Sequence, residues 1–261
     1  MARKPDWAIE KERARRGAGG GESTVWLFGL HAVRDALRNP ARKRKRLIVT
    51  RNAADRLAED IAASGMEPEI GDARKFPAPL DPQSVHQGAA LEVEPLDWGS
   101  VSERCAPRGE APVVLLLDRV SDPHNVGAIL RSAEVFGARA VVAPARHSSP
   151  ETGALAKSAS GALERQPYLR VTNLARAMEA LREMGYAIVG LDGEGDAELG
   201  EALAPYGDQP LALALGSEGP GLRQLTRDLC DTLARIPASG QFGSLNVSNA
   251  AAVSLYAARR S

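Results

Sequence analysis

The sequence predicts an α/β protein in which a parallel sheet follows a smaller α/β domain. In residues 112–261, short apolar runs alternate with helical segments, which is typical of a parallel sheet covered on both faces. Residues 23–95 show a similar alternation on a smaller scale. The stretch 96–111 between them holds Gly99, Ser100, Pro107 and Gly109 and little periodicity, so we expect a linker there.

The larger predicted domain begins with the apolar run Val113–Leu117, which ends at Asp118 and is typical of a buried parallel strand. Apolar spacing, caps and glycine stops define the other elements. We expect further strands at 140–142, 187–191, 211–215 and 233–236, and helices at 126–136, 174–184, 222–229 and 247–259.

The smaller domain is expected to span residues 23–95, with ordered structure from about Val25. Apolar residues at helical spacing predict a helix at 29–37, which Pro40 stops, and another at 53–64, which Gly65 ends. Strands are expected at 46–50 and 89–93. Residues 1–22 combine six basic side chains with four glycines, and we expect them to be a disordered basic tail.

The net charge of zero conceals an asymmetry along the chain. Residues 1–51 carry 14 basic and 5 acidic side chains, whereas the remainder carries 19 and 28. The basic end is either a solubilising tail or an arm that neutralises phosphates. The two cysteines exclude a disulfide scaffold and a cysteine-based zinc module, and they fit the cytoplasm. The longest aliphatic run is too short to span a membrane, so we expect no membrane segment. With too few cysteines for a zinc module, we also expect no metal.

Three segments, each after a predicted strand, carry more polar groups than the local fold requires. Ligands of open α/β sheets bind beyond the carboxyl ends of the strands, so the three segments could meet. In the first, residues 118–133, Asn125 is either a helix cap or a functional amide. Arg131, beside the small residues Ser132 and Ala133, is either a surface ion-pair partner or a ligand-binding group.

The second segment, residues 215–222, reads Leu-Gly-Ser-Glu-Gly-Pro-Gly-Leu. Its glycines permit a tight turn and the close approach of a ligand to the backbone. The spacing matches neither a P-loop nor a dinucleotide fingerprint, so phosphate cradling is not expected. Glu218 is informative, because a strand-to-helix turn needs no carboxylate.

The third segment, residues 236–250, places Ser244, Asn246, Ser248 and Asn249 around the start of the last predicted helix. One of these side chains is enough to cap that helix. The surplus of hydroxyl and amide groups indicates side chains directed at a ligand.

Together the three segments resemble the motifs of the SpoU-type RNA 2'-O-ribose methyltransferases. The matching patterns are D-x-V-x-D-P-x-N-V-G-x-x-x-R-S-A, L-G-S-E-G-x-G-L and I-P-x-x-G-x-x-x-S-L-N-V-S-N-A. Upstream, G-L-H-A-V-x-x-A-L and V-H-Q-G look like the RNA-binding domain of the subgroup that methylates 23S rRNA guanosine. The resemblance covers residues 25–260, and the basic tail and Asn249 depart from it.

The resemblance implies properties that periodicity does not reveal. It implies a C-terminal trefoil knot in the parallel sheet, a homodimer, S-adenosylmethionine as cofactor and RNA, most closely 23S rRNA, as substrate. By motif position, the cofactor-binding residues are Gly216, Ser217, Gly219, Ile236, Leu245 and Asn246. The catalytic residues implied are Asn125, Arg131, Glu218, Ser244 and Asn246.

The implied reaction is the attack of a ribose 2'-oxygen on the methyl carbon of a sulfonium. Arg131 is either a general base or a bidentate clamp that lowers the pKa of the hydroxyl by its charge, and the sequence leaves both open. Two other functions also stay open: a tRNA 2'-O-methyltransferase, and a non-catalytic rRNA-binding assembly factor that keeps the fold.

Overall fold

The computed structural model describes residues 24–81, 83–108, 111–239 and 245–259. Its contacts divide the chain into two compact units. The first unit comprises residues 1–97 and 150–164, and the second comprises residues 98–149 and 165–261. The expected tail, residues 1–22, lies outside the described residues. Among the residues described, no helix is long and apolar enough to cross a membrane.

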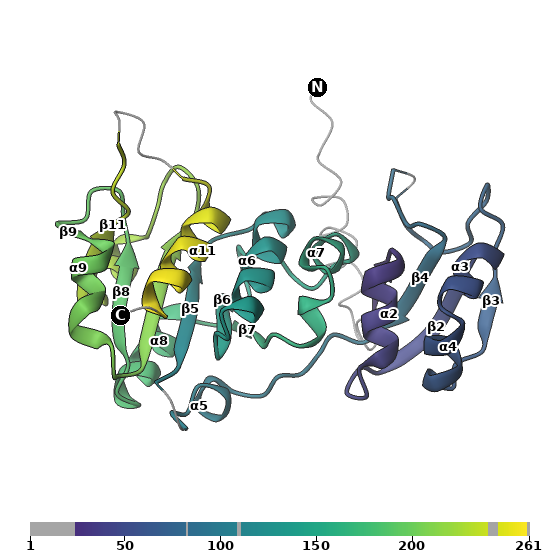
Figure 1. The fold of residues 1–261 in the computed structure, drawn as a ribbon, viewed down its shortest axis with the longest axis horizontal. Coiled ribbons are helices and arrows are strands. Elements are labelled where there is room, and N and C mark those ends of the chain that lie inside the picture. Colours follow the sequence, from purple (N-terminus) through teal and green to yellow (C-terminus); the bar gives the residue numbers. More distant parts are fainter. Residues whose placement is uncertain (1–23, 82, 109–110, 240–244, 260–261) are drawn as a thin grey trace. The chain divides into compact units, whose positions relative to one another are not determined.

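The first unit is built on a four-stranded sheet in the order β1-β4-β2-β3 (Figure 1). Strand β4 pairs antiparallel with β1 and β2, and β3 pairs parallel with β2. The strands are β1 (Val25–Phe28), β2 (Arg44–Val49), β3 (Pro68–Ile70) and β4 (Ala89–Val93). The helices are α2 (Leu30–Arg38), α3 (Arg51–Arg56), α4 (Ala58–Ser64) and α7 (Gly153–Ala159), with the 3-10 turn η1 (Ala162–Glu164).

The second unit contains a seven-stranded sheet in the order β7-β6-β5-β10-β8-β11-β9, and every pairing in it is parallel. The strands are β5 (Val113–Asp118), β6 (Ala140–Pro144), β7 (Tyr168–Val171), β8 (Ala187–Leu191), β9 (Ala197–Glu198), β10 (Leu211–Gly216) and β11 (Thr232–Arg235). The helices are α5 (Val101–Arg104), α6 (Pro123–Val135), α8 (Leu174–Glu183), α9 (Leu199–Leu203), α10 (Gln224–Asp228) and α11 (Val247–Ala258), with η2 (Ala204–Tyr206). The predicted α/β fold with a parallel sheet is confirmed.

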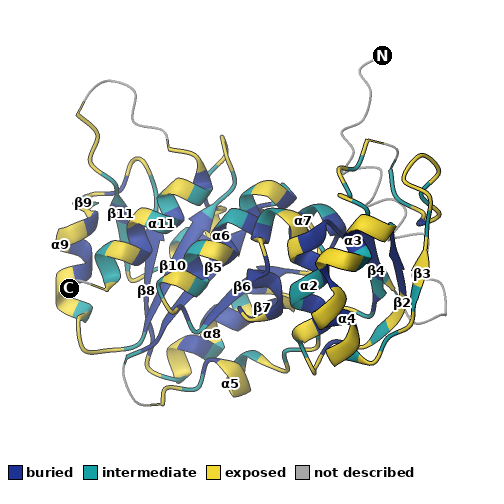
Figure 2. Ribbon diagram, turned by 45° about the vertical axis from the view of Figure 1, so that its right-hand side comes forward, coloured by how far each residue is buried: buried dark blue, intermediate teal, exposed yellow. Residues whose placement is uncertain are grey.

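Helices cover both faces of this sheet. Helices α6 and α11 pack side by side over β5 and β6 (Figure 1), and α11 also contacts β10. Helix α8 packs on the opposite face, with α5 and α10 beside it. Successive residues of a strand point to opposite faces, so a strand covered on both sides must be apolar throughout. Accordingly, all six residues of β5 are buried, and Figure 2 shows the central strands as buried.

Several elements differ from the sequence-based expectation. The single helix expected at 53–64 is interrupted at the buried Leu57, which separates α3 from α4. The stretch expected to be a linker holds α5, which Ser100 and Glu103 begin with a reciprocal capping box. Trp98 and Val101 of that stretch pack against the core of the second unit.

Candidate functional site

A cavity of about 770 Å³ lies at the carboxyl ends of β8, β10 and β11 in the second unit. Three chain segments that follow strands form most of its wall, together with the start of α11. The lining residues include Leu191–Glu194, Leu215–Gly221, Ala234–Ala238, Leu245 and Val247. The cavity therefore lies where parallel sheets bind their ligands.

The turn after β10 can form only because it contains glycines. Ser217 and Gly221 form an isolated bridge, so the chain doubles back between them. A Cβ on Gly216 would lie 2.0 Å from the carbonyl carbon of Gly221. Gly219 and Gly221 adopt φ angles of 85° and 69°, which disfavour other residues. Backbone atoms of this turn therefore lie open to the cavity.

The first predicted motif starts its helix earlier than expected. Helix α6 begins at Pro123, and its cap is Asp122, whose side chain accepts a hydrogen bond from the backbone N–H of His124. Asn125 is therefore not the cap, and its amide is available for other contacts. Asn246, by contrast, does cap α11, because its Oδ1 accepts from the N–H of Ser248 at 2.9 Å.

Hydrogen bonds join one residue from each of the three motifs. Asn246 Nδ2 donates to Glu218 Oε1 at 2.6 Å and to Asn125 Oδ1 at 3.0 Å. Asn125 Nδ2 also donates to Glu218 Oε1, at 3.2 Å. The two amides are thereby fixed in orientation, and their donors converge on one carboxylate oxygen. We call these three residues the amide–carboxylate cluster.

The cluster lies at the edge of the cavity. Glu218 lines the cavity directly, and Asn246 lies between the two lining residues Leu245 and Val247. Asn246 Oδ1 also accepts from Ser248 Oγ at 2.5 Å, so its side chain is held on both sides. Such a site can orient a hydroxyl group and accept its proton, since a carboxylate and oriented amides can both bind it.

The structure does not bring Arg131 to this cluster. Its side chain is exposed on α6 and makes no hydrogen bond or ion pair with any residue that the structure describes. Arg131 lies six positions after Asn125 in the helix, which turns it about 120° away around the helix axis. Arg131 instead shares a face of α6 with Val135, one turn further along.

The expected cofactor-binding residues lie at the cavity with one exception. Gly216, Ser217, Gly219, Ile236 and Leu245 all line it, whereas Asn246 belongs to the cluster at its edge. Ser244, expected to be catalytic, lies outside the described residues. Within the described ranges, no group of three His, Cys, Asp or Glu side chains could hold a metal ion.

Sequence reasoning missed two acidic residues that support the cavity wall. Asp118 is completely buried at the end of β5, and it accepts hydrogen bonds from Arg223 N at 3.0 Å, Arg223 Nε at 2.7 Å and Thr226 Oγ1 at 2.7 Å. Asp192, directly after β8, lines the cavity and pairs with Arg227. Both are acidic residues at the carboxyl end of a predicted strand, and that position was the available signal.

Two family models match this chain. The model described as the SpoU rRNA Methylase family matches residues 112–256. The model described as RNA 2'-O ribose methyltransferase substrate binding matches residues 26–98. The first covers more than half of the chain, and the two together cover most of the described residues.

Curated relatives and a solved structure agree with these matches. The chain is 39% identical over 235 residues to the 23S rRNA (guanosine-2'-O-)-methyltransferase RlmB of Pseudomonas aeruginosa, which is 88% of this chain and 94% of the relative. It is 39% identical over 241 residues to RlmB of Ralstonia nicotianae, with coverages of 90% and 94%. The SpoU methyltransferase AviRb from Streptomyces viridochromogenes, crystallised with AdoMet, superposes with a TM-score of 0.76 at 26% identity, covering 97% of this chain and 95% of AviRb.

Proposed function

The chain belongs to the SpoU rRNA methylase family, and we propose that it transfers a methyl group from S-adenosylmethionine to a ribose 2'-hydroxyl of 23S rRNA, at a guanosine. The observation that carries the proposal is the amide–carboxylate cluster. It joins one residue of each motif through hydrogen bonds at the edge of the cavity.

The residues around the cavity fit S-adenosylmethionine. A volume of about 770 Å³ is within the range of cofactor sites. Leu191, Ile236 and Leu245 supply apolar wall for an adenine ring, and the glycine turn exposes backbone groups. Glu194 and Glu218 supply negative charge for a cationic ligand, whereas the charge of Asp192 is offset by its ion pair with Arg227. When bound, the cofactor supplies an activated methyl group on a sulfonium.

We assign the chain's own residues the tasks of orienting the hydroxyl and accepting its proton. Asn125 and Asn246 hold Glu218 Oε1, and among the described residues Oε2 accepts no hydrogen bond. Glu218 is thus the acceptor that faces the substrate, and the amides fix its position. Orientation of this kind contributes several kcal/mol, up to about 7–11 in well-aligned systems. Arg131 acts on the RNA, either as a clamp while Glu218 accepts the proton, or as the base in place of Glu218.

We also propose a homodimer that forms through α6 and α11. Val135 is 77% exposed on α6, and Val253 and Tyr256 are 42% and 50% exposed on α11. Phe136 and Tyr256 contact each other edge to face with ring centroids 6.1 Å apart, which joins these side chains into one apolar patch. Light scattering should report a monomer for Val135→Glu and a dimer for Leu225→Glu, which changes an equally apolar exposed residue on α10.

A trefoil knot is the third part of this proposal. After β11, beside β8, the chain returns to α11, which packs against α6 and β5 on the other side of β10. This return of the chain from one side of β10 to the other supports the proposed knot. The cytoplasm is the compartment in which an enzyme acting on ribosomal RNA would work.

Methyl transfer is the direct test. The full-length protein is incubated with tritiated S-adenosylmethionine and 23S rRNA, and in a separate reaction with tritiated S-adenosylmethionine and tRNA. The labelled nucleotide is then located by the resistance of a 2'-O-methylated site to alkali. We expect label at one guanosine of 23S rRNA. Label in tRNA alone would favour a tRNA enzyme, and binding of rRNA without label would favour an assembly factor.

A variant of the cluster provides the control. Asn246→Ser keeps a good helix cap but removes the amide that donates to Glu218. We expect little change in stability and a turnover lower by about tenfold or more, the effect of losing the two oriented hydrogen bonds that this amide donates.

A further inference from the structure

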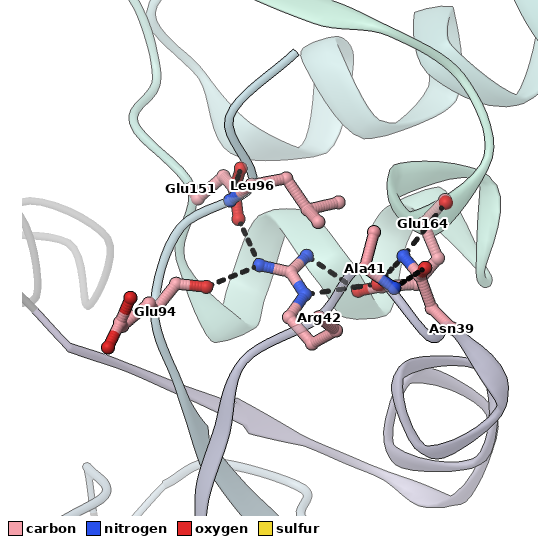
Figure 3. A network of polar contacts seen from close by, with 7 residues as sticks. All are labelled: Asn39, Ala41, Arg42, Glu94, Leu96, Glu151 and Glu164. Atoms are coloured by element: carbon pink, nitrogen blue, oxygen red, sulfur yellow. Dashed lines mark hydrogen bonds and ion pairs between the residues drawn. The ribbon is translucent and has the colours of Figure 1, made fainter.

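Arg42 lies in a buried network of charges in the first unit (Figure 3). Its side chain has no exposed surface, and its guanidinium donates to two carboxylates. The Nη1 group donates to Glu151 Oε2 at 2.9 Å, and Nη2 and Nε donate to Glu164 Oε1 and Oε2 at 2.7 and 3.0 Å. Nη1 also donates to the carbonyl oxygen of Glu94 at 2.8 Å.

Backbone and amide groups complete the network. Glu151 Oε1 accepts from the N–H of Leu96 at 3.0 Å, and Asn39 Nδ2 donates to Glu164 Oε2 at 2.9 Å. Every oxygen of the two carboxylates therefore has a partner. Burial raises the pKa of Glu151, and the nearby positive charge of Arg42 opposes this rise.

The partners of Arg42 come from a distant part of the sequence. Arg42 lies in the range matched by the substrate-binding family model, whereas Glu151 and Glu164 lie in the range matched by the methylase model. They flank α7, which packs against β1 and α2. The packing is close, since a Cβ on Gly153 would lie 2.3 Å from the ring of Phe28.

Arg42 also fixes the beginning of a basic stretch. Lys43, Arg44, Lys45 and Arg46 follow it directly, and the Lys43 side chain is 74% exposed. The pairing of β2 with β4 shifts register between Arg44 and Arg46, and such irregularities redirect side chains. Arg42 is linked to these cations through Glu94, whose carbonyl oxygen accepts from Arg42 and whose carboxylate pairs with Lys43 and Lys45.

We propose that residues 150–164 contribute to the binding of rRNA by the first unit. We further propose that Arg42 is a positioning residue, which holds this segment and the adjacent basic stretch in the arrangement that binds rRNA. This inference rests on the proposed function. Without Arg42, two carboxylates would be buried with no cation beside them, a situation that strongly favours opening of the segment.

The test uses full-length variants with matched controls. Arg42→Met removes the buried cation. Arg46→Met removes one positive charge from the same stretch, but from an exposed ion pair with Glu69. The triple variant Arg42→Met, Glu151→Met, Glu164→Met removes all three charges, which buried clusters often tolerate. For each, hydrogen exchange of residues 150–164, affinity for 23S rRNA by filter binding and affinity for S-adenosylmethionine by calorimetry are measured.

In Arg42→Met we expect exchange of 150–164 to rise and rRNA affinity to fall, each by at least about tenfold, while cofactor affinity stays within about twofold. Arg46→Met should leave exchange unchanged and weaken rRNA binding by no more than a few-fold. The triple variant should recover both protection and rRNA affinity, because Arg42 acts by position. If Arg42→Met does not fold, Arg42→Lys, which keeps the charge without the planar fork, should show the same pattern more weakly.

Unchanged exchange in Arg42→Met would show that Arg42 does not hold the segment. Raised exchange with unchanged rRNA affinity would show that the segment plays no part in binding. Either result overturns the inference. These readouts do not depend on methyl transfer, so a wild-type protein that binds rRNA but transfers no methyl group counts against the proposed function alone.

Discussion

Replacing Asp118 by asparagine should weaken cofactor binding although Asp118 does not line the cavity. The buried carboxylate accepts three hydrogen bonds, all from Arg223, two residues after the glycine turn, and Thr226 of α10. Asp118 and Gly216 are also paired across β5 and β10. The side chain thus connects the end of one strand to both ends of the turn that carries Glu218.

The magnitude follows from these contacts. Hydrogen bonds to a charged group contribute about 1.5–3 kcal/mol each. Asparagine keeps one side-chain oxygen as an acceptor, but its NH2 group replaces the other oxygen and faces a hydrogen-bond donor. Because the Arg223 side chain is 46% exposed and can be solvated, we expect a loss of about 3 kcal/mol of stability, near the lower limit for breaking a buried pair. At roughly 2–4 °C per kcal/mol, Tm should fall by about 6–12 °C.

Cofactor affinity should fall by about 10- to 100-fold, since 1.4 kcal/mol corresponds to tenfold and one or two of these bonds hold the turn in place. Calorimetry well below the lowered Tm measures this without interference from unfolding. Thr226→Val and Thr226→Ser form a matched pair, because only serine keeps the hydroxyl that donates to Asp118. A folded Asp118→Asn protein with wild-type affinity for S-adenosylmethionine would refute the reasoning.

Three further predictions concern other parts of the chain. Arg131→Ala should abolish methyl transfer, while the cofactor affinity measured by calorimetry should stay within a few-fold of wild type. An active Arg131→Lys variant whose pH–rate profile is shifted downward would indicate that Arg131 is a base, and an inactive Arg131→Lys variant would indicate a bidentate clamp. Removal of residues 1–21 deletes six basic side chains and should flatten the slope of log rRNA affinity against log salt by up to about four to five units; an unchanged slope would indicate a solubilising tail. Burial raises the pKa of Cys105 to about 11 and of Cys230 to about 12, so both should react with iodoacetamide at pH 8 at least about 100-fold more slowly than a free thiol; rapid labelling of the native protein would contradict this.

The sequence predicts the centre of the second unit well. The apolar runs at 113–117, 187–191 and 211–215 are β5, β8 and β10 to within one residue, because strands buried on both faces must be apolar throughout. The rule that ligands lie beyond the carboxyl ends of strands correctly indicated that the three motifs could meet, as Asn125, Glu218 and Asn246 do. The order of the strands, with β10 between β5 and β8, has no local signal in the sequence.

One misplaced helix start and two features that the sequence analysis did not predict have different physical origins. The start of α6 carried a readable signal, since Asp122 followed by Pro123 is a cap followed by a favoured first helical residue. The surroundings of Arg42 carried none, because its partner Glu164 is 122 residues away. Helix α7 also had no signal in the sequence. It is short and rich in small residues, and it is stabilised by its packing against other elements rather than by its own sequence.

The separation of Arg131 from the amide–carboxylate cluster bears on how the reaction site is assembled. Within one chain, Glu218 and the two amides lie at the cavity, while Arg131 lies on the exposed face of α6 that also carries Val135. Arg131 is about 120° around the helix from Asn125, so within one chain its side chain leaves α6 in a different direction from the amide. If two copies associate through α6 and α11, as we propose, Arg131 borders that interface. Arg131 of one chain and Glu218 of the other would then lie at one reaction site. Dimerisation would in that case be required for catalysis, because each chain supplies part of the site.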